Sequence, residues 1–396
     1  MTRLRARRRT EEGATALLVG LMAVVLIGIS AFTTDLGLAY VSKRQLQTAS
    51  DSAALAAAGV YAQYPGTCES LADDLLPASQ AIAVEAKSEA DSLRALNRPG
   101  STGGVVDVEC GDSGTLDVTY ESSGVTPAGL GQIFGVSDIE SSRTSTATVS
   151  VPTTVRNLRP WGICSAQAPH EEFPSRVMRV AYPGNGHIPV DCPGSNIPGN
   201  WWLMDCPGTG GSTGETADSI RDGCRQDVRS VPDQPNPSTP TTLSSFLRAA
   251  CTDDAEHCLS GDTGRNFHNS QITNEWQRLV GETIIVPIFC GDPTCAPAAT
   301  VGSGGTGVRY PIYKFASVTV CGFQIKNTRS TPSDLPTGIC DDRNLSGFRS
   351  DDDLGNNQTY FLYVFHMIME SGSTNSSECA LGFDCDGGLR RVLITE

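Results

Sequence analysis

GATALLVGLMAVVLIGISAFTT, residues 13–34, is the stretch that decides the fold of this chain. It is 22 residues long and contains no charged side chain, and about 20 apolar residues are enough to cross a bilayer as a helix. A lone span must be helical, because its backbone has to satisfy its own hydrogen bonds inside lipid. Five arginines precede it: Arg3, Arg5, Arg7, Arg8 and Arg9. The positive-inside rule keeps such a cluster in the cytoplasm.

Two alternatives to a membrane anchor fit the sequence less well. A cleaved signal peptide has a shorter apolar region followed by a small-residue cleavage site, whereas here Asp35 follows at once and helix-forming residues continue. A buried helix of a soluble protein does not explain the arginines in front. We therefore predict an uncleaved signal-anchor, with residues 1–13 as a basic cytoplasmic stub, residues 14–34 as the transmembrane helix, and the rest outside the cell membrane.

The distribution of cysteine agrees with this topology. All fourteen cysteines follow the span, and thiols outside the membrane meet oxidants and pair. Connectivity cannot be derived from a sequence, so only proximity suggests partners. The pairs suggested in this way are Cys251 with Cys258, Cys290 with Cys295, and Cys379 with Cys385.

Charge limits the possible partners. The chain has a net charge of −15, and the part after the stub holds 24 basic and 42 acidic groups, a net charge of −18. Phosphate backbones attract basic surfaces. The composition therefore argues against a nucleic-acid partner.

The apolar helix should continue beyond the membrane. Residues 14–61 contain no proline, and the next stop signal is Pro65, which predicts a stalk helix over residues 35–63. Small or apolar residues recur along it with alternating spacings of three and four, the pattern of a helix-packing seam: Ala39, Ser42, Leu46, Ala49, Ala53, Ala56 and Val60. This seam packs either against another membrane-anchored helix, which is the functional interpretation, or on the chain's own outer part.

Two further regions complete an α+β fold class. Residues 64–155 are predicted to form a small helix-plus-hairpin module, with a helix over 67–98, strands at VVDVEC (105–110) and TLDVTYE (115–121), and a strand at 144–155. Residues 156–396 are predicted to form a mainly β, disulfide-rich extracytoplasmic domain. Its clearest strands are at 282–290, 313–325, 359–369 and 390–396, with a helix near 242–250.

Motifs for chemistry are weak. GDSG (111–114) is similar to the nucleophile loop of trypsin-like proteases, but the first histidine, His170, comes after Ser113, and Asp and Gly are ordinary turn residues. Acidic clusters at 341–342, 351–353 and 384–386 match no full calcium loop. Trp201 and Trp202 lie in a loop and are expected to cover a thin core rather than to form an exposed ligand platform. We predict no catalytic, cofactor-binding or metal-binding residue.

The N-terminal stretch contains a recognisable set of residues. They are EGA (12–14), the apolar run, TDLG (34–37), AY (39–40), Arg44, LQ (46–47), Ala49 and DSAALAAA (51–58). Together they resemble the TadE/TadG-like family of tight-adherence (Flp) pilus assembly proteins. The resemblance implies a structural or assembly role at the cytoplasmic membrane without an active site. It implies partners among other Tad/Flp pilus assembly or pilin proteins, contacted through the N-terminal helix.

Looser pieces are similar to the extended TadG-like proteins of actinobacteria: LRPW (158–161) with Cys164, PGNW (198–201) followed by MD (204–205), VPI (286–288), and residues 313–323. Pilin-like relatives are cut after a glycine and have a glutamate at the fifth mature position. If Gly13 were that glycine, the fifth residue would be Leu18. Prepilin processing is therefore not expected, and permanent retention fits better.

The sequence thus predicts a single-pass membrane component of a Flp/Tad-type pilus that acts by helix packing and protein contact, either as a single chain or as an oligomer. The alternative is a membrane-anchored extracellular ligand-binding or hydrolase domain unrelated to pili.

Overall fold

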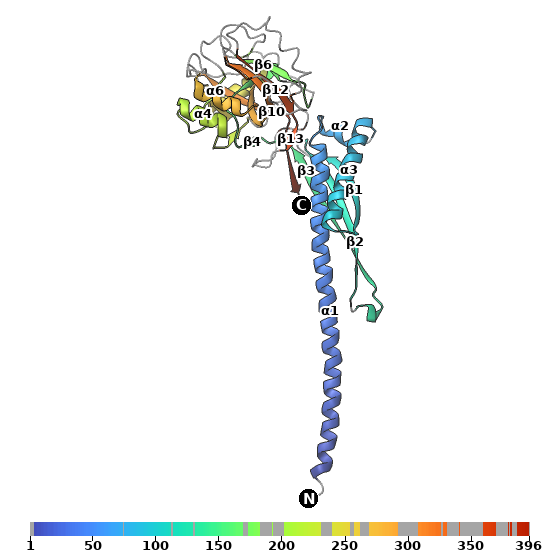
Figure 1. Ribbon diagram of the computed structural model, residues 1–396. Coiled ribbons are helices and arrows are strands. Elements are labelled where there is room, and N and C mark those ends of the chain that lie inside the picture. Colours follow the sequence, from blue (N-terminus) through green and yellow to red (C-terminus); the bar gives the residue numbers. More distant parts are fainter. Residues whose placement is uncertain are drawn as a thin grey trace.

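The computed structural model consists of a long helical rod with two folded units at one end (Figure 1). The first unit contains the second half of the rod, the chain up to residue 150 and a returning segment at 368–395. The second unit is formed by the described residues between 154 and 366. The structure describes residues 4–73, 75–111, 114–129, 131–168, 173–182, 192, 202–230, 240–253, 257–261, 269–291, 308–325, 328–330, 340, 359–369, 379, 381 and 386–395.

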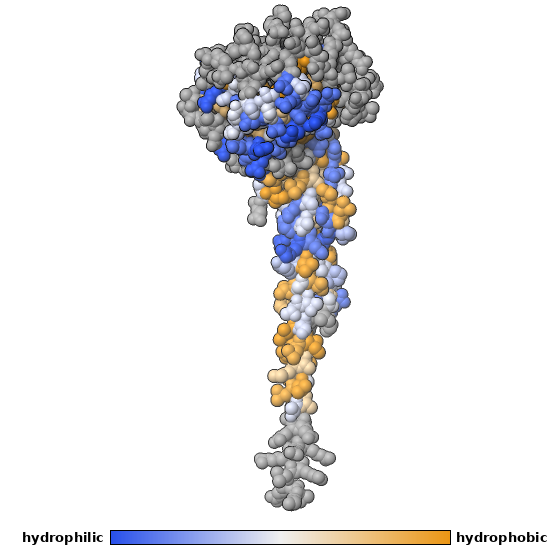
Figure 2. Space-filling model, turned by 60° about the vertical axis from the view of Figure 1, so that its left-hand side comes forward, coloured by the Kyte–Doolittle hydropathy of each residue, from blue (hydrophilic) through white to orange (hydrophobic). Residues whose placement is uncertain are grey.

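The rod is helix α1, Leu4–Tyr61. Among the described residues, α1 is the one helix long and apolar enough to cross a membrane. Its large apolar side chains from Leu17 to Phe32 are all more than half exposed, and apolar surface follows the rod below the folded units (Figure 2). No described part of the chain covers this segment, as expected for a helix that meets lipid.

The first unit is a five-stranded sheet with helices on one face. Its strand order is β1-β2-β3-β14-β13, and α1 and α3 pack on the sheet. The elements are α2 (Cys68–Ala72), α3 (Pro77–Asn97), β1 (Thr102–Cys110), β2 (Leu116–Pro127), the 3-10 helix η1 (Gly131–Phe134), β3 (Asp138–Ser150), β13 (Ile368–Met369) and β14 (Leu389–Thr395). Pro77 splits the helix predicted over 67–98, because proline suits the first turn of a helix and not its interior.

The core of this unit follows the alternation of a half-buried strand. Along β2, Leu116, Val118 and Tyr120 are completely buried, and they meet alanines of α1 and α3. Alanine lets the helices approach the sheet closely and loses no side-chain entropy on burial.

The second unit is built around a curved, mostly antiparallel sheet of order β5-β9-β10-β12-β6, with β8 and β11 also pairing with β10. The elements are β4 (Thr154–Val155), β5 (Ile163–Cys164), the 3-10 helix η2 (Ser165–Gln167), β6 (Met178–Tyr182), α4 (Thr213–Asp222), β7 (Val228–Arg229), α5 (Pro240–Asp253), β8 (Cys258–Ser260), α6 (Ser270–Arg278), β9 (Thr283–Phe289), β10 (Arg309–Ile325), β11 (Thr328–Ser330) and β12 (Thr359–His366). β5 joins β9 in parallel, and β4 pairs with β7 in a separate two-stranded sheet.

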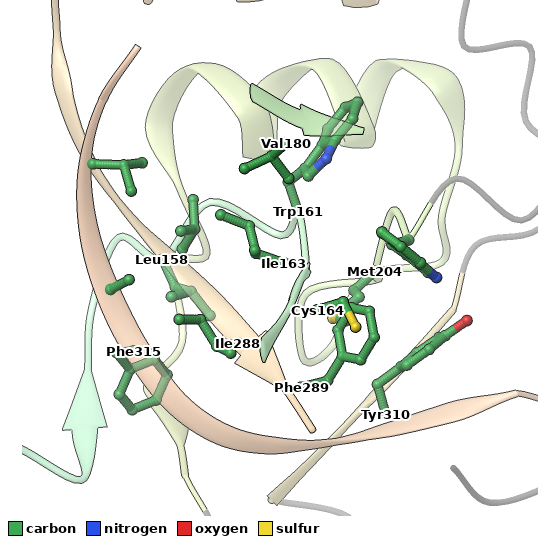
Figure 3. Close-up of a cluster of buried hydrophobic side chains, with 14 of the residues drawn as sticks. Leu158, Trp161, Ile163, Cys164, Val180, Met204, Ile288, Phe289, Tyr310 and Phe315 are labelled. Atoms are coloured by element: carbon green, nitrogen blue, oxygen red, sulfur yellow. The ribbon is translucent and has the colours of Figure 1, made fainter. Parts of the chain in front are cut away.

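Aromatic packing fills the core of the second unit. Trp161 lies 4.6 Å from Trp276, 4.7 Å from Tyr182 and 4.7 Å from Phe361 between ring centroids, in edge-to-face arrangements. These geometries suit the ring quadrupoles. Figure 3 shows Trp161 beside Ile163 and Val180, with Ile288 and Phe289 contributed by β9.

Disulfides support both units. Cys68–Cys110 joins α2 to β1. The second unit contains four described bridges, Cys164–Cys192, Cys206–Cys224, Cys251–Cys258 and Cys321–Cys340. The Cys251–Cys258 bridge is the pairing that proximity suggested. Cys290 and Cys379 are also disulfide-bonded, while Cys295 and Cys385 lie outside the described residues.

The returning segment differs from the sequence prediction. Residues 390–396 were expected in the domain beginning at 156, but β14 pairs with β3 of the first unit. The strand predicted over 359–369 also divides, because β12 belongs to the second sheet and β13 to the first. Pairing between strands so far apart in sequence has no local signal. The boundaries proposed at 63/64 and 155/156 remain predictions.

The joint between the units is tightly packed. Gly388 forms a bridge with Ala316 of β10, and a Cβ atom at Gly387 would overlap the carbonyl oxygen of Phe315. Beside it, Arg390 and Asp386 form an ion pair at 2.6 Å in which both side chains are at most 5% exposed. The mainly β second unit is therefore attached to the first unit, which contains the end of α1, by a packed contact and not by a free linker. The predicted α+β class, with its long N-terminal apolar helix and disulfide-containing β domain, is confirmed.

Candidate functional site

The predicted packing seam lies on the part of α1 that belongs to the first unit. Leu46, Ala49 and Ala53 are completely buried, and Ala39 and Ala56 are partly buried. The surrounding side chains belong to α3, β2 and β3 of the same chain. The structure thus corresponds to the second interpretation left open by the sequence, in which this face packs on the chain's own outer part. Leu46, Ala49 and Ala53 are not accessible to a partner helix in this arrangement.

Polar side chains on the same face fix α1 to the sheet. The Ser50 hydroxyl donates to the Arg143 carbonyl at 2.6 Å and accepts from the Ser122 N–H at 3.1 Å. Asp51 accepts hydrogen bonds from Gln47 at 2.8 Å and from Ser145 at 2.5 Å. Each bond is directional, so together they fix both the rotation and the height of the helix on the sheet.

A second polar cluster joins α3 to β2. Asp91 accepts from the Tyr120 hydroxyl at 2.6 Å and pairs with Lys87 at 2.6 Å, while Arg94 donates to the Tyr120 oxygen at 3.1 Å. Desolvation raises the pKa of Asp91, but the hydrogen bonds from Lys87 and Tyr120 outweigh it, and the pKa is lowered overall. Desolvation and the bond to Asp91 raise the pKa of Tyr120 to about 12.

The tip of the β2–β3 hairpin is attached to α1 at the end of the apolar run. Asp35 accepts hydrogen bonds from the backbone N–H groups of Gly129, at 3.0 Å, and Gly131, at 2.5 Å. A Cβ atom at either glycine would lie only 3.0 Å from an Asp35 oxygen, so a larger residue there would have to displace the carboxylate by a few tenths of an ångström. Figure 1 shows the hairpin extending along α1 toward the N-terminal end of the rod. No sequence pattern connects Asp35 with this loop.

The second unit has a hollow of about 710 Å³ on its surface. Four arginines line it, Arg156, Arg225, Arg229 and Arg309, together with Asp205 and Asp227. Arg156 and Asp227 form an ion pair at 2.6 Å, so their charges compensate each other. The remaining lining has more arginine than aspartate, in a chain of strongly negative net charge. Arginine suits carboxylate and phosphate groups geometrically.

The other residues considered for chemistry do not converge. Trp202 is completely buried, in agreement with a plug rather than a platform. Trp201, His170, Ser113 and the clusters at 341–342 and 351–353 lie outside the described residues, as does Asp384. Within the described part of the chain, no three His, Cys, Asp or Glu residues are arranged to hold a metal ion.

Comparison with known proteins identifies the segment that contains the rod. Residues 13–60 match the family model described as putative Flp pilus-assembly TadE/G-like. The chain carries a TadE/G-like domain. Searches of curated proteins and of solved structures gave no match.

The TadE/G-like domain coincides with α1 from the start of its apolar run to its last turn. It therefore includes the exposed span, Asp35 and the buried seam, while the sheet and the second unit lie outside the match. The domain supports a role related to Tad pilus assembly, and its apolar helix indicates membrane anchoring.

Proposed function

We propose that the chain is a non-catalytic, membrane-anchored structural or assembly component of a Flp/Tad-type pilus. Residues 14–34 anchor it, the arginine-rich stub stays in the cytoplasm, and both folded units face outward. The observation that carries the proposal is that α1 has two different halves. Its N-terminal half exposes apolar side chains, and its C-terminal half packs against the sheet of the first unit. A helix divided in this way couples a membrane position rigidly to an outer domain.

The rod sets the height of the outer part. Residues 36–61 give a helical length of about 39 Å at 1.5 Å per residue. The second unit is attached near the far end of this length through the β14 joint. It is therefore held well above the bilayer, at a height suited to contact with a fibre or with other outer components of the apparatus.

Partner contacts through the N-terminal helix must use surfaces that the chain leaves open. The buried seam does not qualify, so we assign lateral contacts to the exposed span between Leu17 and Phe32. Helix association in lipid depends on van der Waals packing rather than on the hydrophobic effect. The sequence of the span therefore matters beyond its apolarity.

The experiment replaces residues 14–34 by a Leu/Ala helix of equal length in the host cell. This variant keeps an anchor and removes the native side chains. We expect it to reach the membrane, with its outer part digestible by protease added outside and its N-terminal tag protected, and to show reduced piliation. Normal piliation in cells lacking the chain altogether would refute the role. Normal piliation with the Leu/Ala helix would show that the span serves only as an anchor and that its native side chains make no required partner contact.

One observation favours the alternative of a ligand-binding surface domain, namely the arginine-lined hollow. Its chemistry fits an anionic ligand. Binding of inorganic phosphate and of an acidic peptide to the purified full chain should weaken in Arg225→Gln/Arg309→Gln and stay unchanged in Arg176→Gln, which alters an exposed arginine away from the hollow. Equal binding by all three proteins would exclude a role for the hollow.

A further inference from the structure

The exposed apolar surface of the chain continues past the predicted end of the membrane span. On α1, Leu36, Leu38, Tyr40 and Val41 are between 45% and 61% exposed. On the neighbouring hairpin, Val125 is 56% exposed and Val136 is 49% exposed. The loop AGLGQIFGVS (128–137) contains no charged residue. Residues 36–41 of α1, together with the described residues of the hairpin between 125 and 137, form an apolar collar at the base of a strongly acidic outer part.

The position of the collar follows from the length of the span. Residues 14–34 extend about 31 Å as a helix, which matches a hydrocarbon core of about 30 Å. Asp35 therefore lies at the boundary of the core when the span is centred. Because Gly129 and Gly131 bond to Asp35, the hairpin tip lies at the same depth.

The hydrogen bonds to Asp35 lower the cost of placing its carboxylate at the boundary of the hydrocarbon core. A carboxylate at the edge of lipid is costly unless its oxygens have hydrogen-bond donors. Here each oxygen receives a backbone N–H from the tip. The tip thus gives Asp35 a polar environment, and its sequence from 128 to 137 carries no charge.

The outer limit of the collar has the composition of a membrane interface. Tyr40 lies about 7.5 Å beyond Asp35 along the helix, within a polar interfacial layer of about 5–8 Å. The Arg44 guanidinium lies 5.7 Å from the centre of the Tyr40 ring, and Lys43 is exposed next to it. Aromatic rings at this level, with basic side chains reaching toward lipid phosphates, are typical of interfacial anchors.

We propose that the collar binds the surface of the outer leaflet, with the hairpin tip inserted among anionic phospholipid headgroups. The proposal rests on the anchoring role given above and adds a second membrane contact to the span. A single helix can tilt and rotate in a bilayer. With the hairpin tip in the same surface, both motions of the rod are restricted, and the outer units keep a defined direction.

The test uses a photo-crosslinking benzophenone amino acid placed at one of three positions in the full chain, reconstituted in vesicles of phosphatidylcholine and phosphatidylglycerol. The positions are Val136 in the tip, Leu26 in the span, and Val84 on α3, which is 71% exposed but belongs to the opposite end of the first unit from the tip. Mass spectrometry identifies what each position captures. We expect lipid adducts at Leu26 and Val136 and none at Val84.

The outcomes separate this proposal from the anchoring proposal. A lipid adduct at Leu26 with none at Val136 would overturn the collar and leave the anchor intact. No adduct at Leu26 would overturn the anchor. Protein captured at Val136 in place of lipid, in the same vesicles or in host membranes, would show that the tip docks on another chain.

A second variant tests the attachment of the tip. Asp35→Ala removes both acceptors for Gly129 and Gly131, so the lipid adduct at Val136 should fall several-fold while the adduct at Leu26 is unchanged. An undiminished adduct at Val136 would show that Asp35 does not position the tip.

Discussion

Substituting Ala53 by leucine tests whether the α1 seam is internal to the chain. Ala53 is completely buried among alanines of α1 and α3 and side chains of the sheet. Leucine adds three carbon atoms where the helices and sheet are in contact, and overpacking of this kind costs about 1–3 kcal/mol. For a unit of this size, about 1 kcal/mol lowers Tm by roughly 2–4 °C.

The assay is hydrogen exchange of the detergent-solubilised full chain, followed by mass spectrometry of its peptides. Peptides of β2 and β3 should exchange about 5- to 150-fold faster in Ala53→Leu, the ratio that corresponds to about 1–3 kcal/mol. Peptides of β9 and β10 serve as an internal reference from the second unit. Gln45→Leu places the same side chain at an exposed position of α1 and should change exchange little.

A contrary result is easily recognised. If Ala53→Leu leaves exchange in β2 and β3 unchanged but abolishes piliation, the seam contacts a partner helix, and the packing described here does not hold in the assembled apparatus.

Three further outcomes are expected. The folded-state pKa of Asp91 is lowered, so its contribution to stability is complete above the unfolded pKa of about 3.9 and is lost as pH falls through the folded pKa. The unfolding temperature of the first unit should therefore decrease when the pH is lowered below about 4. The decrease should be less steep in Asp91→Asn. Replacing Cys68 and Cys110 by serine opens a loop with a sequence separation of 42 and should lower the urea-unfolding free energy of the first unit by about 4 kcal/mol in the chain-entropy description. Asp386→Asn removes the charge that faces buried Arg390 and should cost about 3–5 kcal/mol in the same assay, whereas adding Arg390→Met should recover most of it.

Much of the architecture was accessible from the sequence because its signals are local. The uncharged run at 13–34 and the absence of proline as far as residue 61 predict one long helix, and α1 is that helix. The alternating pattern around GDSG predicts the β1–β2 hairpin, which is present. Cys251 and Cys258 are close enough in sequence for proximity to suggest their bridge.

The remaining features depend on contacts that no local pattern specifies. The seam with Leu46, Ala49 and Ala53 indicates close packing. Small residues, however, allow packing on the chain's own sheet as well as on a partner helix. Asp35 looks like the polar end of a span, and its bonds to Gly129 and Gly131 join residues more than ninety positions apart. The β-branched residues of β14 fit the edge of either sheet, so its place beside β3 was not predictable.

The pairing of β14 with β3 has a consequence for biogenesis. The sheet that holds the rod is interrupted after Ser150 and completed only by Leu389–Thr395, so it cannot close until synthesis and export have passed those residues. Until then β3 presents an open edge, and such edges recruit other strands. A chain whose export stops early would therefore expose the unpaired edge of β3 at the membrane. Proteases or chaperones can distinguish such a chain from a fully folded molecule by this edge.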